Sequence, residues 1–119
     1  ISDLVDSLCL LIDTVPNHNT TDVVVKSPND SLSGVAPFRI VNIGNSNSIN
    51  LLDFITSIEK TLGKKAVKNF LPMQAGDVPA TLADVSLLKS LTNYLPNTNY
   101  ERGIEKFISW YCEHYQVQS

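Results

Sequence analysis

The sequence predicts an α/β fold made of helices with a few short strands. Apolar residues recur at helical spacing in 3–15, in 51–62 and in the stretch that follows Thr98. By contrast, FRIVNIG at 38–44 carries apolar residues on both of its alternating faces, which is typical of a strand covered on both sides in a parallel sheet. A second short strand is predicted at 65–71, in KAVKNFL.

The ends of the first two helices follow from single residues. Ser2 or Asp3 is the expected cap of the first helix, and Pro16 ends it. Asn50 is the expected cap of the second helix, and Gly63 is its expected stop. Between these helices the sequence is rich in Asn, Ser, Thr and Asp, so a loop is expected there.

The loop and the C-terminal third complete the predicted elements. The loop covers 17–36 and includes a short strand at Val23–Val25. A third helix is predicted from about Asp84, its expected cap, to Leu91. Thr98 and Glu101 have capping-box spacing, so a fourth helix is expected to start there. One face of this fourth helix carries Ile104, Phe107, Ile108, Tyr111 and Tyr115.

Composition excludes several classes of protein. The chain has 119 residues, the length of one ordinary domain, and its net charge of −3 with scattered basic residues argues against nucleic-acid binding. The small cluster Lys64, Lys65 and Lys68 is interpreted as a solvated edge rather than a phosphate site. No apolar run is long enough for a membrane span. Cys9 and Cys112 lie far apart without CxxC spacing, so a soluble, cytoplasmic protein is expected.

No complete active site is visible in the residues. The sequence has no glycine-rich phosphate loop, no Tyr-x-x-x-Lys pair and no supported Ser/His/Asp or Cys/His set. The two histidines lack ligand-like neighbours. We therefore assign no catalytic, cofactor-binding or metal-binding residue.

One loop nevertheless holds a carboxylate in an unusual setting. In MQAGDVPAT, Asp77 directly follows Gly76 and precedes Pro79 by two residues. A carboxylate in such a loop either stabilises a turn or binds a ligand. The spacing alone favours the turn and leaves the ligand role open.

Three stretches of the sequence resemble a known protein family. They read ISDLVDSLCLLID, PFRIVNIGNSNSINLLDFITSIEKTLGKKAVKNFLPMQAGDVPATLADVSLL and PNTNYERGIEKFISWYCEHY. They are similar to the C-terminal part of extended short-chain dehydrogenase/reductase enzymes that act on nucleotide sugars. The resemblance is greatest to the NAD-dependent UDP-glucuronate 4-epimerases of capsular and surface polysaccharide synthesis, and it covers nearly all of the chain except 17–36.

The resemblance implies a particular fold and a particular cofactor. It implies the C-terminal fragment of an extended Rossmann-type nucleotide-sugar epimerase, with 1–119 forming a single partial domain that is mainly substrate-binding. The strand at 38–43 would then extend the Rossmann sheet of the parent enzyme, whose upstream NAD-binding domain is absent here. NAD is expected in the parent enzyme and not on this segment.

The resemblance also gives a role to the MQAGDVPAT loop. Many relatives read Arg-Pro-Gly-Asp there, with the Arg on the diphosphate and the Asp accepting hydrogen bonds from the uridine ribose. Gly76 and Asp77 match the last two residues of that motif. Gln74 replaces the Arg and Ala75 the Pro, and a Gln donates hydrogen bonds but carries no charge. The expected substrate-binding residues are Gln74, Gly76 and Asp77.

Several functions stay open at this point. The parent enzyme is expected to be a UDP-glucuronate 4-epimerase, with this segment inactive by itself and its exposed strand able to pair with a second copy. A fragment of a UDP-glucuronate decarboxylase or of a nucleotide-sugar dehydratase is an alternative, although MQAGDVPAT favours the epimerase. A stand-alone, non-catalytic binding module is a further alternative from a different class.

Overall fold

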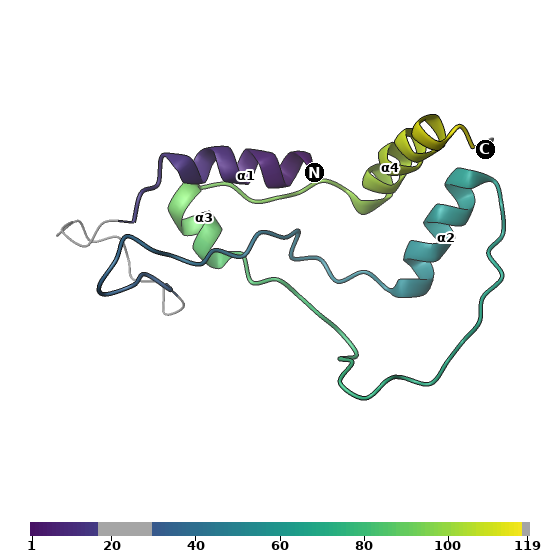
Figure 1. Cartoon of the computed structure of the whole chain (residues 1–119), viewed down its shortest axis with the longest axis horizontal. Helices are drawn as coiled ribbons and strands as arrows, with labels where there is room; N and C mark the ends of the chain where they lie inside the picture. The colour runs from purple at the N-terminus through teal and green to yellow at the C-terminus, as the bar shows by residue number, and fades with distance from the viewer. Residues whose placement is uncertain (17–29, 118–119) are drawn as a thin grey trace. The chain divides into compact units, whose positions relative to one another are not determined.

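The computed structural model describes residues 1–16 and 30–117. Over these residues the chain forms helices joined by long irregular segments, and none of these helices is long and apolar enough to cross a membrane (Figure 1). All of the predicted helices are present, with ends shifted by a few residues. They are α1 (Ser2–Ile12), α2 (Leu51–Leu62), α3 (Ser86–Thr92) and α4 (Tyr100–Tyr115).

Both strands predicted within the described residues are wrong. Neither 38–44 nor 65–71 forms a strand, so the described part of the chain is helical rather than α/β. An apolar alternation fits a pleated strand, but a strand exists only where a neighbour accepts and donates its backbone hydrogen bonds. The described residues include no such neighbouring strand. The predicted strand at Val23–Val25 lies outside the described residues.

The helices group into two compact units, each formed by two parts of the sequence. Unit 1 comprises Ile1–Ser46 and Leu82–Asn97, and unit 2 comprises Asn47–Thr81 and Thr98–Ser119. Helices α1 and α3 belong to the first, and α2 and α4 to the second. The single partial domain expected from the sequence stays a prediction about the complete protein.

Unit 1 is built where α1 contacts α3. Ser7 of α1 and Leu88 of α3 are both fully buried. The Ser7 hydroxyl donates a hydrogen bond of 2.6 Å to the carbonyl of Asp3, one helical turn earlier, so burial leaves it satisfied. The Tyr94 hydroxyl donates to the Asp3 carboxylate at 3.3 Å and links the end of α3 to the start of α1.

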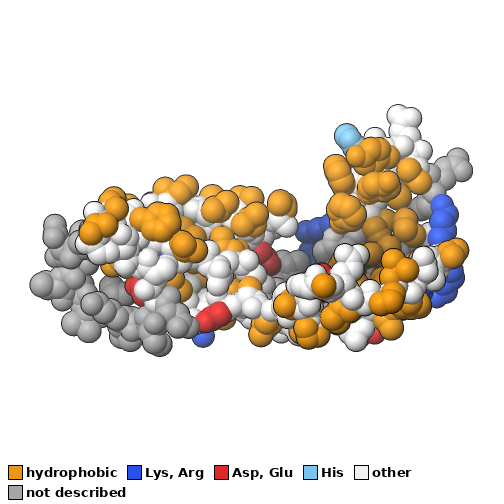
Figure 2. Space-filling model, turned by 60° about the horizontal axis from the view of Figure 1, so that its bottom comes forward, with side chains coloured by type: hydrophobic (Ala, Val, Ile, Leu, Met, Phe, Trp, Pro, Cys, Tyr) orange, Lys and Arg blue, Asp and Glu red, His pale blue; other side chains and the backbone are white. Residues whose placement is uncertain are grey.

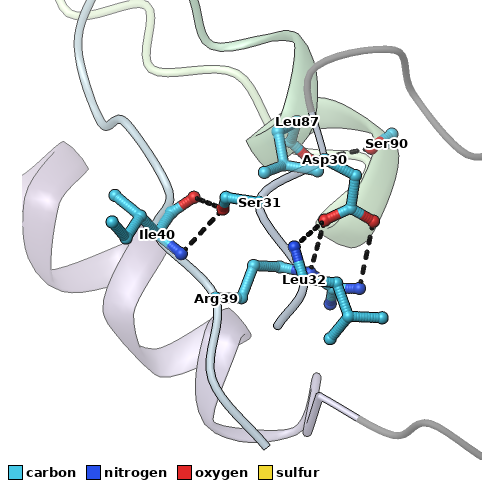
Figure 3. Close-up of polar contacts among 7 residues, drawn as sticks. All are labelled: Asp30, Ser31, Leu32, Arg39, Ile40, Leu87 and Ser90. Atoms are coloured by element: carbon cyan, nitrogen blue, oxygen red, sulfur yellow. Dashed lines mark hydrogen bonds and ion pairs between the residues drawn. The ribbon is translucent and has the colours of Figure 1, made fainter. Parts of the chain in front are cut away.

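The segment after residue 30 is held by side chains instead of a strand ladder (Figure 3). The Arg39 guanidinium donates to both carboxylate oxygens of Asp30, at 2.9 and 3.2 Å. The Ser31 hydroxyl accepts a hydrogen bond from the Ile40 N–H at 2.8 Å and donates one to the Ile40 carbonyl at 2.6 Å. One serine side chain therefore satisfies both backbone groups that a neighbouring strand would otherwise have satisfied.

Unit 2 is built where α2 contacts α4. Ile104 and Ile108 of α4 are buried, with 6% and 7% of their surface exposed. The predicted ends of α2 are confirmed: the Asn50 side chain accepts from the Leu52 N–H at 2.8 Å, and Gly63 ends the helix with a φ of 66°.

Two predicted helix starts need correction. The cap of α4 is Asn99 rather than Thr98, because the Asn99 side chain accepts from the N–H groups of the second and third helical residues. Helix α1 begins at Ser2, and its cap residue, Ile1, makes no side-chain capping hydrogen bond.

Hydrophobic side chains remain widely visible on the surface shown in Figure 2.

Candidate functional site

The residues of MQAGDVPAT lie in the irregular segment that follows α2. Within it, the Asp77 N–H donates a hydrogen bond of 3.1 Å to the carbonyl of Gln74 and closes a four-residue turn. Gly76, the third residue of this turn, has a φ of +99°, as in a type II turn. A side chain at this position would be strained, which explains the glycine. The turn thus brings the predicted residues Gln74, Gly76 and Asp77 together.

The side chain of Asp77 takes no part in closing the turn. Gln74 and Asp77 are both exposed. Within 1–16 and 30–117, the Asp77 carboxylate has no hydrogen-bond or ion-pair partner, and the turn is closed by backbone groups alone. A turn-stabilising aspartate would accept a backbone N–H through its side chain. The geometry therefore leaves this carboxylate available to a ligand.

An open groove lies beside the turn in unit 2. It is lined by the mostly polar residues that precede α2, by the first residues of that helix, by Phe70 and by the residues after Asp77. Its volume is about 1090 Å³, slightly above the range of about 300–1,000 Å³ that is usual for small-molecule sites. The backbone and side-chain lining includes Asn47–Leu52 and Val78–Thr81.

A buried carboxylate on α2, which the sequence analysis missed, anchors the start of the same segment. Glu59 is 6% exposed. Its carboxylate accepts hydrogen bonds from Lys68 Nζ at 2.6 Å, from the Ala66 N–H at 3.0 Å and from Lys65 Nζ at 3.1 Å. The hydrogen bond from Lys68, followed by those from Ala66 and Lys65, lowers the pKa of Glu59 from 4.5 to about 2.

Sequence spacing contains a signal that could have identified Glu59. Leu52, Ile55, Glu59 and Leu62 follow one another at helical spacing, so a carboxylate interrupts an apolar stripe. A charge at such a position needs a buried partner. Lys68 is that partner, since only 32% of its side chain is exposed, whereas Lys65 keeps 86% exposed as a solvated edge would.

Other candidate residues have structural roles. The predicted cap of α3, Asp84, needs correction: the cap residue is Val85, which makes no side-chain capping hydrogen bond, although the Asp84 carboxylate accepts from the Ser86 N–H at 2.9 Å. Among the described residues, no group of three or more His, Cys, Asp or Glu side chains is placed to hold a metal ion.

Comparison with curated proteins finds relatives along almost the whole chain. It is 40% identical over 116 residues to a protein of Rhizobium meliloti (strain 1021) named Probable UDP-glucuronate 4-epimerase, covering 98% of this chain and 34% of that protein. Protein CapI of Staphylococcus aureus is 40% identical over 98 residues, covering 76% of this chain and 29% of CapI. UDP-glucuronate 4-epimerase 1 of Arabidopsis thaliana is 40% identical over 83 residues, covering 69% of this chain and 19% of that protein.

These matches confirm the resemblance predicted from the sequence. No protein-family model matches the chain. The chain spans about a third of the length of the R. meliloti relative and less of the other two.

Proposed function

We propose that this chain forms part of the UDP-sugar-binding wall of a UDP-glucuronate 4-epimerase, because it is similar over 98% of its length to a protein named Probable UDP-glucuronate 4-epimerase and over 69% to UDP-glucuronate 4-epimerase 1. The observation that supports this proposal is the carboxylate of Asp77, exposed on a turn that backbone groups close without it. The complete protein would act on UDP-glucuronate in surface polysaccharide synthesis. The free thiols of Cys9 and Cys112 agree with the cytoplasmic location that we also propose.

Asp77 is suited to binding the hydroxyl groups of a ribose. An ionised carboxylate accepts two hydroxyl hydrogen bonds, and each charge-assisted bond contributes about 1.5–3 kcal/mol. The turn fixes the backbone that carries this carboxylate, so less conformational freedom is lost on binding. The neighbouring groove offers space into which the rest of a nucleotide sugar can extend.

Gln74 and Gly76 would have lesser roles in the same site. Gln74 can donate a hydrogen bond to a diphosphate oxygen but contributes no positive charge. Charge compensation for the diphosphate must therefore come from outside this turn. Gly76 holds the positive φ of the turn, and no atom lies within 4 Å of the position where its Cβ would be, so a ligand can approach this backbone closely.

In the proposed epimerase, NAD supplies the hydride chemistry. This chain lacks the glycine-rich loop and the Tyr-x-x-x-Lys pair, so none of its residues is assigned to NAD or to proton transfer. Its own residues bind and orient the substrate. The 119-residue segment alone is therefore expected to be inactive.

The activity itself is tested with the complete protein that carries these residues. Incubation with UDP-glucuronate should give its C4 epimer without loss of carbon. Release of CO₂ from the hexuronate would instead identify a decarboxylase. Turnover by the purified 119-residue segment would contradict the proposed division of roles.

The role of Asp77 is tested by replacing it with alanine in the complete protein. Asp77→Ala should weaken UDP binding by about tenfold to a few hundredfold, since each 1.4 kcal/mol is a factor of ten. NAD retention and the melting temperature should stay nearly unchanged. Glu105→Ala removes an exposed carboxylate from α4 and is the matched control. Lower stability with normal UDP affinity in Asp77→Ala would show a turn-stabilising residue instead.

A further inference from the structure

Glu59 connects α2 to the first residues of the segment that leads to Asp77. Only 4% of its side chain is exposed, and both carboxylate oxygens are used. One oxygen accepts from Lys68 Nζ and from the Ala66 N–H, and the other accepts from Lys65 Nζ. A carboxylate buried this deeply is stable only with such partners, so the contact fixes 65–68 against α2.

The same segment then borders the open groove that the first residues of α2 also line. Phe70 lines the groove at the N-terminal end of α2, and only Asn69 separates it from Lys68. Val78, immediately after Asp77, lines that groove as well. The turn that carries Asp77 therefore lies between two residues that line this groove, while its own residues are exposed.

From these contacts we propose that Glu59 is a positioning residue for UDP-sugar binding, because it fixes the start of the loop that presents Asp77. The proposal rests on the function proposed above for Asp77. Without the Glu59 contacts, 65–68 would be ordered only when the ligand binds. That ordering cost would then be subtracted from the binding free energy.

A double-mutant cycle in the complete protein tests this role. Glu59→Gln, Asp77→Ala and the double variant are each titrated with UDP by calorimetry. Glu59→Gln should weaken UDP binding about tenfold when Asp77 is present, the change expected if about 1.4 kcal/mol of ordering moves to the binding step. When Asp77→Ala is already present, the added effect should be less than about twofold, because coupled residues are not additive.

Kinetics separate positioning from a general structural role. In Glu59→Gln, KM for UDP-glucuronate should rise in the same proportion as the UDP dissociation constant, with kcat and NAD retention unchanged. Glu105→Gln makes the same chemical change at an exposed position of α4 and should alter neither parameter. Chymotrypsin should also cleave Glu59→Gln faster at the exposed Phe70, whose surface is 74% accessible.

A second pair of variants covers the case in which Glu59→Gln does not fold. Lys68→Gln removes the shortest contact but keeps the Glu59–Ala66 hydrogen bond, and Lys60→Gln on the exposed side of α2 is its control. Lys68→Gln should weaken UDP binding and Lys60→Gln should not.

The outcomes distinguish the two proposals. If Asp77→Ala leaves UDP affinity unchanged, the proposed site is wrong and the role of Glu59 is lost with it. If Asp77→Ala weakens binding but Glu59→Gln and Lys68→Gln do not, only the positioning role is overturned. Equal effects of Glu59→Gln with and without Asp77, together with a fall in kcat, would show general destabilisation and would also overturn it.

Discussion

The two units of the chain differ in which side chains of their amphipathic helices are buried. In unit 1, α1 buries Ser7 completely, whereas most apolar side chains of the same helix stay exposed. Leu4, Val5 and Leu8 are 41%, 49% and 50% exposed, and Ile12 is 73% exposed. The apolar stripe predicted for this helix is present, but these four residues of it remain exposed and form what we call the outer face of α1.

In unit 2 the apolar stripes face each other. Ile104 and Ile108 of α4 are buried, and the side chains of α2 that face them line an apolar groove of about 430 Å³ together with α4. The α2 side of this groove is formed by Phe54, Ile58 and Leu62. Asparagine side chains cap both helices, at Asn50 and Asn99.

The difference shows what helical periodicity can and cannot predict. Periodicity marks which face of a helix is apolar, but it does not identify what covers that face. An exposed apolar stripe of this size is uncommon on an isolated domain. We expect the remainder of the complete protein to cover the outer face of α1, in keeping with relatives about three times as long as this chain.

The largest effect on stability is expected from replacing leucines of unit 1 by alanine, once at a buried and once at an exposed position. Leu88→Ala should lower the free energy of unfolding of this chain by about 2–5 kcal/mol, because Leu88 is fully buried. Leu8→Ala should cost less than about 1 kcal/mol, because Leu8 is half exposed. Urea denaturation measures both values.

The same pair of variants should behave differently in the complete protein. There the cost of Leu8→Ala should approach that of Leu88→Ala, since we expect the outer face of α1 to be covered. A small cost in both settings would contradict that expectation.

Replacing a glycine by alanine is expected to lower stability by a smaller amount, and the cause differs between the two units. A Cβ added to Gly44 in unit 1 would lie 2.7 Å from the Cβ of Ala83, so Gly44→Ala should cost about 1–3 kcal/mol by crowding. Gly63 in unit 2 has open space but a φ of +66°. Gly63→Ala should therefore cost about 1 kcal/mol through backbone strain.

Asparagine variants separate these two causes. Asn tolerates the left-handed conformation, so Gly63→Asn should recover most of the stability lost in Gly63→Ala. Gly44→Asn should be no better than Gly44→Ala, because a larger side chain increases the crowding. Thermal melts of the four variants give the result, and recovery at Gly44 would exclude the steric explanation.

The smallest effects on stability are expected at the extremes of pH. Unit 2 should lose stability in acid, and unit 1 should lose stability in alkali. The pKa of Glu59 falls from 4.5 to about 2, so its stabilisation of unit 2 is complete above about pH 4.5 and is lost as the pH falls towards 2. Burial, and then the charges of Asp3 and Asp6, raise the pKa of Tyr94 above 10.0. Stabilisation of unit 1 by neutral Tyr94 is therefore complete below pH 10.0 and is lost as the pH rises further.

Melting curves across the pH range test both pH dependences of stability. Glu59→Gln should reduce the loss of stability in acid without changing the alkaline limb, and Tyr94→Phe should do the reverse. Wild-type acid sensitivity in Glu59→Gln would mean that Glu59 is not the titrating group.

Local signals account for the elements that the sequence predicted correctly. Asn50 and Gly63 define the ends of α2 because capping and left-handed conformations depend on adjacent backbone groups. The strand predicted at 38–44 was wrong because strand pairing depends on a partner elsewhere. In its place the side chain of Ser31 binds the backbone of Ile40, nine residues away, a contact that no periodicity reveals.

For the candidate site, the sequence placed three residues in one loop, and their role in substrate binding stays a prediction. The resemblance placed Gln74, Gly76 and Asp77 in one loop, and the structure places them in one turn. Sequence could not show that backbone groups close this turn, because a turn-stabilising and a ligand-binding aspartate occupy the same motif. Glu59 was missed because its three partners lie in a stretch that the sequence predicted to be a strand with a solvated lysine edge.

Hydrogen exchange of the complete protein, measured with and without UDP, tests whether unit 2 binds the nucleotide while the outer face of α1 in unit 1 does not. UDP should slow exchange in peptides covering 70–81, where the only backbone donor bonded within the described segment is the Asp77 N–H. Exchange in α1 should be unaffected by UDP. The same measurement on Asp77→Ala should show much less protection of 70–81 at equal UDP concentration. Unchanged exchange across 70–81, with protection elsewhere in this chain, would contradict the proposed site.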